Sequence, residues 1–197
     1  DGKDQLYVGQ DELASNDKGR LALYWSQPTP GKVTSMARPE SDMADASTGA
    51  SGQAANAWFT CARATLKPCV VEPYFYVIDG QNVLMTSIVF PLMVNGKVIA
   101  SLSVDINLNS LQAVSQQASQ KLYDGQTQVS ILSATGLLAG YSPDASKLSQ
   151  RLEQVDPASG AQLISALASS TQTHSLRTDH QLKVLAPFAP IPGGKAW

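Results

Sequence analysis

The stretch PYFYVIDGQNVLMTSIVFPLMVNGKVIASLSVDINLNSL, residues 73–111, decides the fold class of this chain. Its β-branched and aromatic residues fall into three runs, which the dipeptides Asp79-Gly80 and Asn95-Gly96 separate. Both dipeptides are typical of tight turns between antiparallel strands, because their residues tolerate positive φ. The expected strands span residues 73–79, 82–94 and 97–106. The stretch therefore predicts an antiparallel meander.

The third expected strand has two chemically different faces. Successive side chains of a strand point to opposite faces, so this strand carries an apolar row and a polar row. The apolar row is Ala100, Leu102, Val104 and Ile106, and the polar row is Ser101, Ser103 and Asp105. We expect the apolar row to pack on a helix and the polar row to face solvent or a polar cavity.

The flanking sequence predicts a second α/β unit. Asn107 is a suitable N-cap for a helix that extends to Leu122. A hairpin about Thr135-Gly136, two short helices within residues 144–169 and two further strands follow. Upstream, we expect a strand at 20–25, an irregular region over 26–57 and a short helix over 53–64. The predicted fold class is α+β, with a first module over residues 1–110, a connecting helix over 111–122 and a second module over 123–197.

Composition and charge exclude several classes of protein. The chain has 197 residues, of which 43% are hydrophobic and 15% charged, and its net charge is -2. The chain therefore lacks the excess of Lys and Arg that is typical of proteins that bind nucleic acid. No apolar run approaches the roughly 20 residues that span a bilayer, and no signal peptide is present. We expect a soluble, mature fragment that binds no nucleic acid.

The two cysteines, Cys61 and Cys69, are spaced C-x7-C, which is neither a redox motif nor a set of zinc ligands. A disulfide across a short loop is the simplest interpretation and would indicate an oxidising compartment. Two unpaired core cysteines are the alternative. The histidines, His174 and His180, are distant in sequence, and we expect both on the surface. We therefore predict neither a metal site nor a cofactor.

Sequence motifs of catalysis are missing from the chain. It contains no G-x-S-x-G and no H-E-x-x-H, and none of its Gly-Lys pairs has P-loop spacing. We therefore expect that the protein is not an enzyme. Aromatic and acidic residues are instead concentrated in the first half of the chain. An aromatic wall with a few acids is suited to an organic cation, through cation–π contacts and ion pairs. The alternative is that the aromatics fill the core and the acids are solvated.

The segment from Trp58 to Leu111 resembles the membrane-distal module of the double-Cache family. The resemblance is carried by WF at 58–59, EPY at 72–74 and MTSIVFPLMVNGKVIASLSVDINLNSL at 85–111. It implies two stacked PAS-like modules in the periplasmic part of an inner-membrane chemoreceptor or related sensor. It also implies a homodimer in the full-length receptor and anchoring by helices outside this chain. The long N-terminal helix of the family is not in this sequence.

In the amino-acid-binding branch of that family, an Arg and a Tyr hold the ligand carboxylate, while aromatic and acidic residues hold the ammonium. Here Asn56 and Ser51 occupy the two carboxylate-binding positions. At the ammonium-binding positions, Trp58, Tyr74 and Asp105 match, Phe59 replaces a Tyr and Tyr76 replaces an Asp. The pattern is similar to the amine-sensing branch, whose members bind polyamines such as putrescine and spermidine, or histamine.

The expected ligand is therefore a small biogenic amine held in the first module, with Asp105 as the main ammonium anchor. The predicted ligand-binding residues are Trp58, Phe59, Glu72, Tyr74, Tyr76 and Asp105, with Asp42 and Asp45 available for a second amino group. An amino acid, a purine or another small cation in the same site is the alternative within the family. A periplasmic carrier protein, or an enzyme with a coincidental meander, is the alternative from another class.

Overall fold

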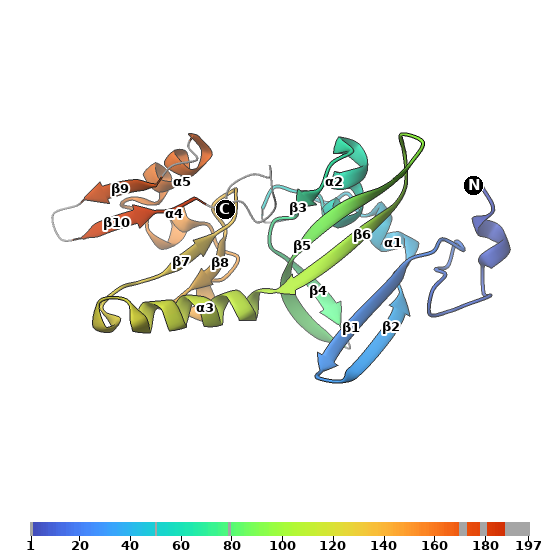
Figure 1. The fold of residues 1–197 in the computed structure, drawn as a ribbon, viewed down its shortest axis with the longest axis horizontal. Coiled ribbons are helices and arrows are strands. Elements are labelled where there is room, and N and C mark those ends of the chain that lie inside the picture. The colour runs from blue at the N-terminus through green and yellow to red at the C-terminus, as the bar shows by residue number, and fades with distance from the viewer. Residues whose placement is uncertain (1, 50, 79, 170–172, 178–180, 188–197) are drawn as a thin grey trace. The chain divides into compact units, whose positions relative to one another are not determined.

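The computed structural model describes residues 2–49, 51–78, 80–169, 173–177 and 181–187 (Figure 1). The chain forms two compact units. The first comprises Asp1–Ser47 and Ala54–Asn56, and the second comprises Thr48–Gln53 and Ala57–Trp197. The expected division into modules at residues 110 and 123 stays a prediction.

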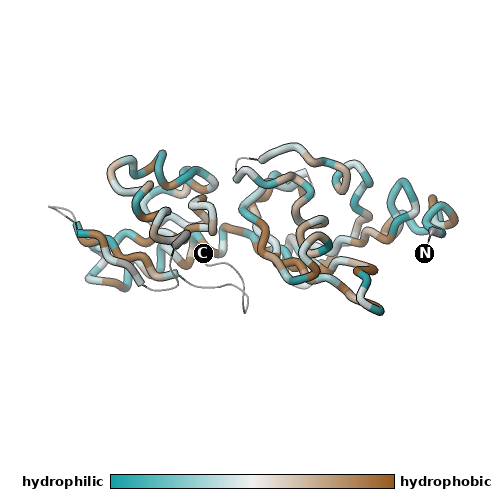
Figure 2. The backbone as a smooth tube through the Cα atoms, turned by 90° about the horizontal axis from the view of Figure 1, so that it is seen from above, coloured by the Kyte–Doolittle hydropathy of each residue, from teal (hydrophilic) through white to brown (hydrophobic). Residues whose placement is uncertain are grey.

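The first unit is built on a hairpin. After the short 3-10 helix η1 (Asp4–Tyr7), strand β1 (Leu23–Thr29) pairs antiparallel with β2 (Lys32–Ala37), and α1 (Glu40–Ala44) follows. The expectation of an irregular region from residue 26 onward is wrong for this hairpin. Pro28 and Pro30 led to the wrong expectation. Proline has no N–H to donate to a neighbouring strand, so its presence in a sequence argues against a strand. Beside the N-terminus, Figure 2 shows mostly polar and neutral colours with a short apolar stretch.

A bidentate ion pair closes the first unit. The Arg20 guanidinium donates from Nε and Nη2 to the two carboxylate oxygens of Glu40, each over 2.9 Å. The Asn16 side chain donates to the same carboxylate over 2.9 Å. These charge-assisted hydrogen bonds lower the pKa of Glu40 against the opposing effect of its partial burial. They join the loop before β1 to the first turn of α1.

The second unit contains the predicted meander. Strands β4 (Tyr74–Ile78), β5 (Gln81–Val94) and β6 (Lys97–Asn107) pair antiparallel in chain order. Asn95 and Gly96, with φ of 49° and 74°, form the turn between β5 and β6. A short strand that the sequence analysis missed, β3 (Cys69–Val70), pairs with β5 opposite Val89 and Ile88. The result is a four-stranded antiparallel sheet.

A β-bulge in β6 sets the register of the two long strands. Next to the turn, Met93 pairs with Val98, but Leu92 then pairs with Ala100, so that Ile99 is an extra residue. From there Asp105 lies opposite Ser87. Without the extra residue Asp105 would pair with Thr86, and its side chain would point to the other face of the sheet. The bulge therefore decides which face carries Asp105.

Helix α2 (Ala57–Thr65) covers the face opposite to the one that we expected a helix to cover. Its residues Ala57 and Ala62 form a buried cluster with Val71 and Val89, on the face that also carries Asp105. On the apolar row, Leu102 is 64% and Val104 is 53% exposed. The expectation that this row packs on a helix is thus wrong. The disulfide between α2 and β3, described below, holds α2 on the polar side.

The rest of the second unit follows the predicted order. Asn107 accepts a hydrogen bond from the Asn109 N–H at the start of α3 (Leu108–Lys121), which confirms the expected N-cap. The remaining strands and α-helices are β7 (Ser130–Leu132), β8 (Leu138–Tyr141), α4 (Leu152–Val155), α5 (Gly160–Ser169), β9 (His174–Arg177) and β10 (Leu182–Leu185), with the short 3-10 helices η2 (Tyr123–Gly125) before β7 and η3 (Ala145–Lys147) before α4. The Gln112 side chain of α3 donates to the Tyr141 carbonyl and accepts from the Tyr141 N–H. This pair fixes α3 along the edge of β8.

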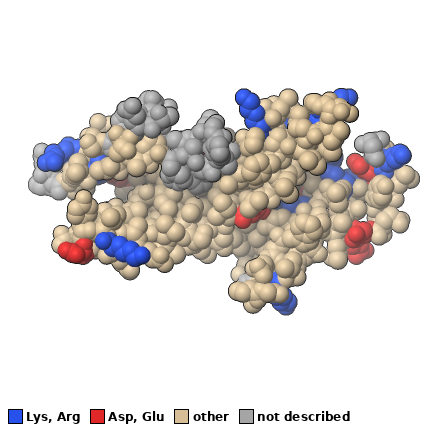
Figure 3. All heavy atoms as spheres, in the orientation of Figure 1, with Lys and Arg blue, Asp and Glu red and all other residues tan. Residues whose placement is uncertain are grey.

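The predicted fold class is confirmed, since the structure is a mixed α+β fold with antiparallel sheets and few helices. Charged side chains are scattered singly or in small groups on the face that Figure 3 shows. Among the described residues, no helix combines the length and the hydropathy that crossing a bilayer requires.

Candidate functional site

The centre of the candidate site is Asp105 on β6. Its Oδ1 accepts a hydrogen bond from the Ser87 hydroxyl over 2.6 Å and another from the Ser103 hydroxyl over 3.0 Å. Asp105 is half-buried, whereas Ser87 is fully buried. Both serines lie on the same sheet face as Asp105, one across the ladder and one two residues away. The sheet therefore holds the carboxylate in place through two hydroxyl donors.

Tyr74 belongs to the same hydrogen-bonded group. Its hydroxyl lies 2.7 Å from the Ser87 hydroxyl. The pairing of Tyr74 with Met85 and of Tyr76 with Val83 places both tyrosines on the face that carries Ser87. Both tyrosines are half-buried. Asp105, Tyr74 and Tyr76 therefore share one face of the sheet.

Helix α2 brings Trp58 to this face and carries Phe59 beside it. Trp58 packs on the same buried cluster as Tyr74. The Phe59 ring lies 5.8 Å from the Trp58 ring, and the Arg63 guanidinium lies 4.6 Å from the Phe59 centroid. The expected disulfide is confirmed, since Cys61 of α2 is bonded to Cys69 of β3. It stabilises the position of α2, and hence of Trp58, over the polar face of the sheet.

The three remaining predicted acids have other partners. Glu72, which is 4% exposed, accepts a hydrogen bond from the Thr135 hydroxyl over 2.9 Å. Asp42 forms an ion pair with Arg38 over 3.3 Å. Asp45 is exposed, and hydrogen bonds from Ser47 lower its pKa. Asp42 and Asp45 belong to the first compact unit and the sheet residues to the second. The role of these acids in ligand binding stays a prediction.

Sequence reasoning missed Ser87 and Ser103 as parts of the site. The sequence did carry a signal for Ser87, because a serine between Met85 and Val89 is unusual on an otherwise apolar row. The pairing of Ser87 with Asp105 depends on the bulge, which the sequence analysis did not predict. Among the described residues, no three His, Cys, Asp or Glu side chains gather as metal ligands would. His180 lies outside the described residues, as does the side chain of His174.

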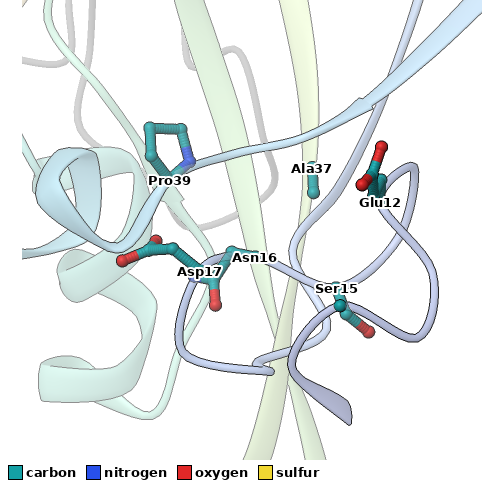
Figure 4. A pocket seen from close by; sticks show the side chains of 7 residues that line it. Glu12, Ser15, Asn16, Asp17, Ala37 and Pro39 are labelled. Carbon is teal, nitrogen blue, oxygen red and sulfur yellow. The ribbon is translucent and has the colours of Figure 1, made fainter.

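A cavity of about 340 Å³ lies in the first unit and was not predicted (Figure 4). Its lining residues are Gly9, Glu12, Ser15, Asn16, Asp17, Ala37 and Pro39. Asn16 is buried and donates to Glu40, and Asp17 accepts from the Glu40 N–H over 2.9 Å. These polar groups are therefore used in holding the loop before β1 against α1.

Comparison with known proteins gives a consistent set of relatives. A sequence model of the methyl-accepting chemotaxis protein-like first PDC sensor domain matches residues 10–113, just over half of the chain. The methyl-accepting chemotaxis protein TlpQ of Pseudomonas aeruginosa is 49% identical over the whole chain. The chain spans 28% of the length of that relative.

Solved structures of low sequence identity share the fold. The periplasmic sensory domain of the Campylobacter jejuni chemoreceptor Tlp1 is 12% identical, with a TM-score of 0.65 over 93% of this chain and 63% of that one. The ligand-binding domain of the Pseudomonas aeruginosa amino-acid chemoreceptor PctC, in complex with GABA, is 19% identical. Its TM-score is 0.51, over 87% of this chain and 69% of that one.

Proposed function

This chain belongs to the methyl-accepting chemotaxis protein-like PDC sensor domains and is the extracytoplasmic sensor domain of a chemoreceptor, and we propose that it binds a small biogenic amine. Putrescine, spermidine and histamine are the candidate ligands. In this proposal the membrane-distal module over residues 1–110 binds the ligand. A connecting helix over 111–122 leads to the membrane-proximal module over 123–197, which transmits the signal toward the membrane. The full-length receptor is then a homodimer that helices outside this chain anchor in the inner membrane.

The observation that supports the proposal is the environment of Asp105. Its carboxylate is half-buried and is held by Ser87 and Ser103, on a sheet face that also carries aromatic rings. A carboxylate in such a place attracts an ammonium group more strongly than an exposed one, because water screens it less. Tyr74 and Trp58 add aromatic surface, over which an organic cation is stabilised.

In the resemblance to the amino-acid-binding branch, position 56 is that of the arginine that holds the ligand carboxylate, and on this ground the residue there favours an amine over an amino acid. Asn56 is neutral and 8% exposed, and its side-chain amide donates to the Met43 carbonyl over 2.8 Å. An arginine at this position would offer a carboxylate two parallel charge-assisted hydrogen bonds, which an asparagine cannot provide. A ligand that carries only amino groups has no need of such a clamp. The proposal therefore distinguishes ligands by the presence of a carboxylate.

Putrescine and GABA form a matched pair for the test. Each has a chain of four carbons with an amino group at one end, and the other end carries a second amino group in putrescine and is a carboxylate in GABA. Titration calorimetry of the domain with both ligands measures the effect of that one group. We expect putrescine, spermidine or histamine to bind at least about tenfold more tightly than GABA or any standard amino acid, which corresponds to about 1.4 kcal/mol. Equal or tighter binding of GABA would overturn the amine proposal and favour an amino-acid sensor.

A further inference from the structure

Ser87 connects two predicted ligand contacts. Its hydroxyl lies 2.7 Å from the Tyr74 hydroxyl and 2.6 Å from Asp105 Oδ1, and the residue has no exposed surface. Serine in the middle of a sheet is otherwise a weak strand former, and a buried hydroxyl needs a partner. The position of Ser87 between a phenol and a carboxylate therefore has chemical consequences for both groups.

The direction of the hydrogen bonds in this group follows from counting protons. An ionised carboxylate only accepts, and a serine hydroxyl has one proton to give. The Ser87 proton is therefore directed at Asp105. The proton in the contact between Ser87 and Tyr74 must then come from the phenol, so that Tyr74 donates to Ser87 and Ser87 donates to Asp105. Ser103 donates to Asp105 as well.

We propose that Ser87 is a positioning residue that makes the Tyr74 hydroxyl an acceptor toward a bound ligand. Once its proton is directed at Ser87, the phenol offers other groups only its oxygen lone pairs. An oxygen acceptor near a carboxylate suits the N–H groups of an ammonium and opposes the oxygens of a second carboxylate. Ser87 thus contributes to ligand selectivity through the orientation of one proton. This inference rests on the proposed function.

The test replaces Ser87 with alanine and uses Ser103→Ala as the matched control. Ser87→Ala releases the Tyr74 proton and leaves Asp105 with the Ser103 donor. We expect the ratio of putrescine affinity to GABA affinity to fall by about tenfold, in line with the loss of one hydrogen bond to a charged group. Ser103→Ala removes the other hydroxyl donor from Asp105 but leaves the orientation of Tyr74, so this ratio is expected to stay within about twofold of the parent value.

A double-mutant cycle with Tyr74→Phe makes the test independent of general packing effects. If the phenol acts through Ser87, the two substitutions are strongly non-additive in putrescine binding, and the double variant loses little more than Ser87→Ala alone. Ser87→Cys keeps nearly the volume of the side chain and weakens the donor, so it should lower the affinity ratio in the same direction, which keeps the test valid if Ser87→Ala does not fold.

Additive losses in the cycle, or an unchanged affinity ratio in Ser87→Ala, would overturn the role of Ser87. A parent domain that binds GABA as tightly as putrescine would overturn the proposed function instead. The two failures are therefore distinguishable in one series of titrations.

Discussion

Replacement of Asp105 by asparagine isolates the charge of the proposed ammonium anchor. The substitution keeps the shape of the side chain, and its amide oxygen can still accept from Ser87 and Ser103. Exposed ion pairs contribute about 0–1 kcal/mol, and desolvated pairs cost about 2–5 kcal/mol when one partner is removed. Asp105 is half-buried, and its Oδ1 is already hydrogen-bonded twice. We therefore expect a loss near the lower end of the second range, about 2 kcal/mol or about 30-fold in amine affinity.

The assay is titration calorimetry with putrescine, spermidine and histamine, together with a thermal melt of the ligand-free domain. The free energy of unfolding should change by less than about 1 kcal/mol, since both serine donors keep an acceptor. Asp124→Asn is the matched control, because it removes the same charge from an exposed aspartate of the second unit. Unchanged amine affinity in Asp105→Asn, with normal affinity in the control, would refute Asp105 as the anchor.

Three further predictions concern stability. Cys61→Ser should lower the free energy of unfolding by about 2–3 kcal/mol, which is the stabilisation expected from the loop-closure entropy of a disulfide across so short a loop. An unchanged chemical-denaturation midpoint would contradict this prediction. The Arg20 hydrogen bonds lower the folded-state pKa of Glu40, so their stabilisation is present above the ordinary Glu pKa of about 4.3 and is lost as the pH falls through the lower folded value. Melting temperature should therefore fall on acidification below about pH 4.3 less steeply in Glu40→Gln than in the parent, and parallel curves would rule this out. Gly140→Ala places a Cβ 2.3 Å from the hydroxyl of the buried Ser115 on α3, and it should lower the free energy of unfolding by about 1–3 kcal/mol. Gly49→Ala is the control, because its Cβ meets only a carbonyl at 3.7 Å, and this variant should have the melting temperature of the parent.

Local patterns predicted much of the site-bearing sheet. Alternation and two turn dipeptides were sufficient for β4, β5 and β6, because these signals act over neighbouring residues. The disulfide also followed from a short spacing and is present. The hairpin of β1 and β2 was missed, since its prolines hide the strand pattern. The partner of Glu72 could not be predicted, because Thr135 is distant in sequence and reaches it only in the folded chain.

The sequence by itself determined the antiparallel meander, the N-cap of α3 and the residues that resemble a chemoreceptor sensor domain. Only the tertiary structure decided which face of the sheet those residues share. The turn at Asn95 and Gly96 alone would pair Asp105 with Thr86, on the face away from Tyr74, and the bulge at Ile99 shifts the pairing to Ser87. The disulfide then holds α2 over that face, so the polar row is covered and much of the apolar row is exposed. The physical reason is the two-residue period of a strand, in which one extra residue exchanges the two faces and no local pattern reveals the exchange.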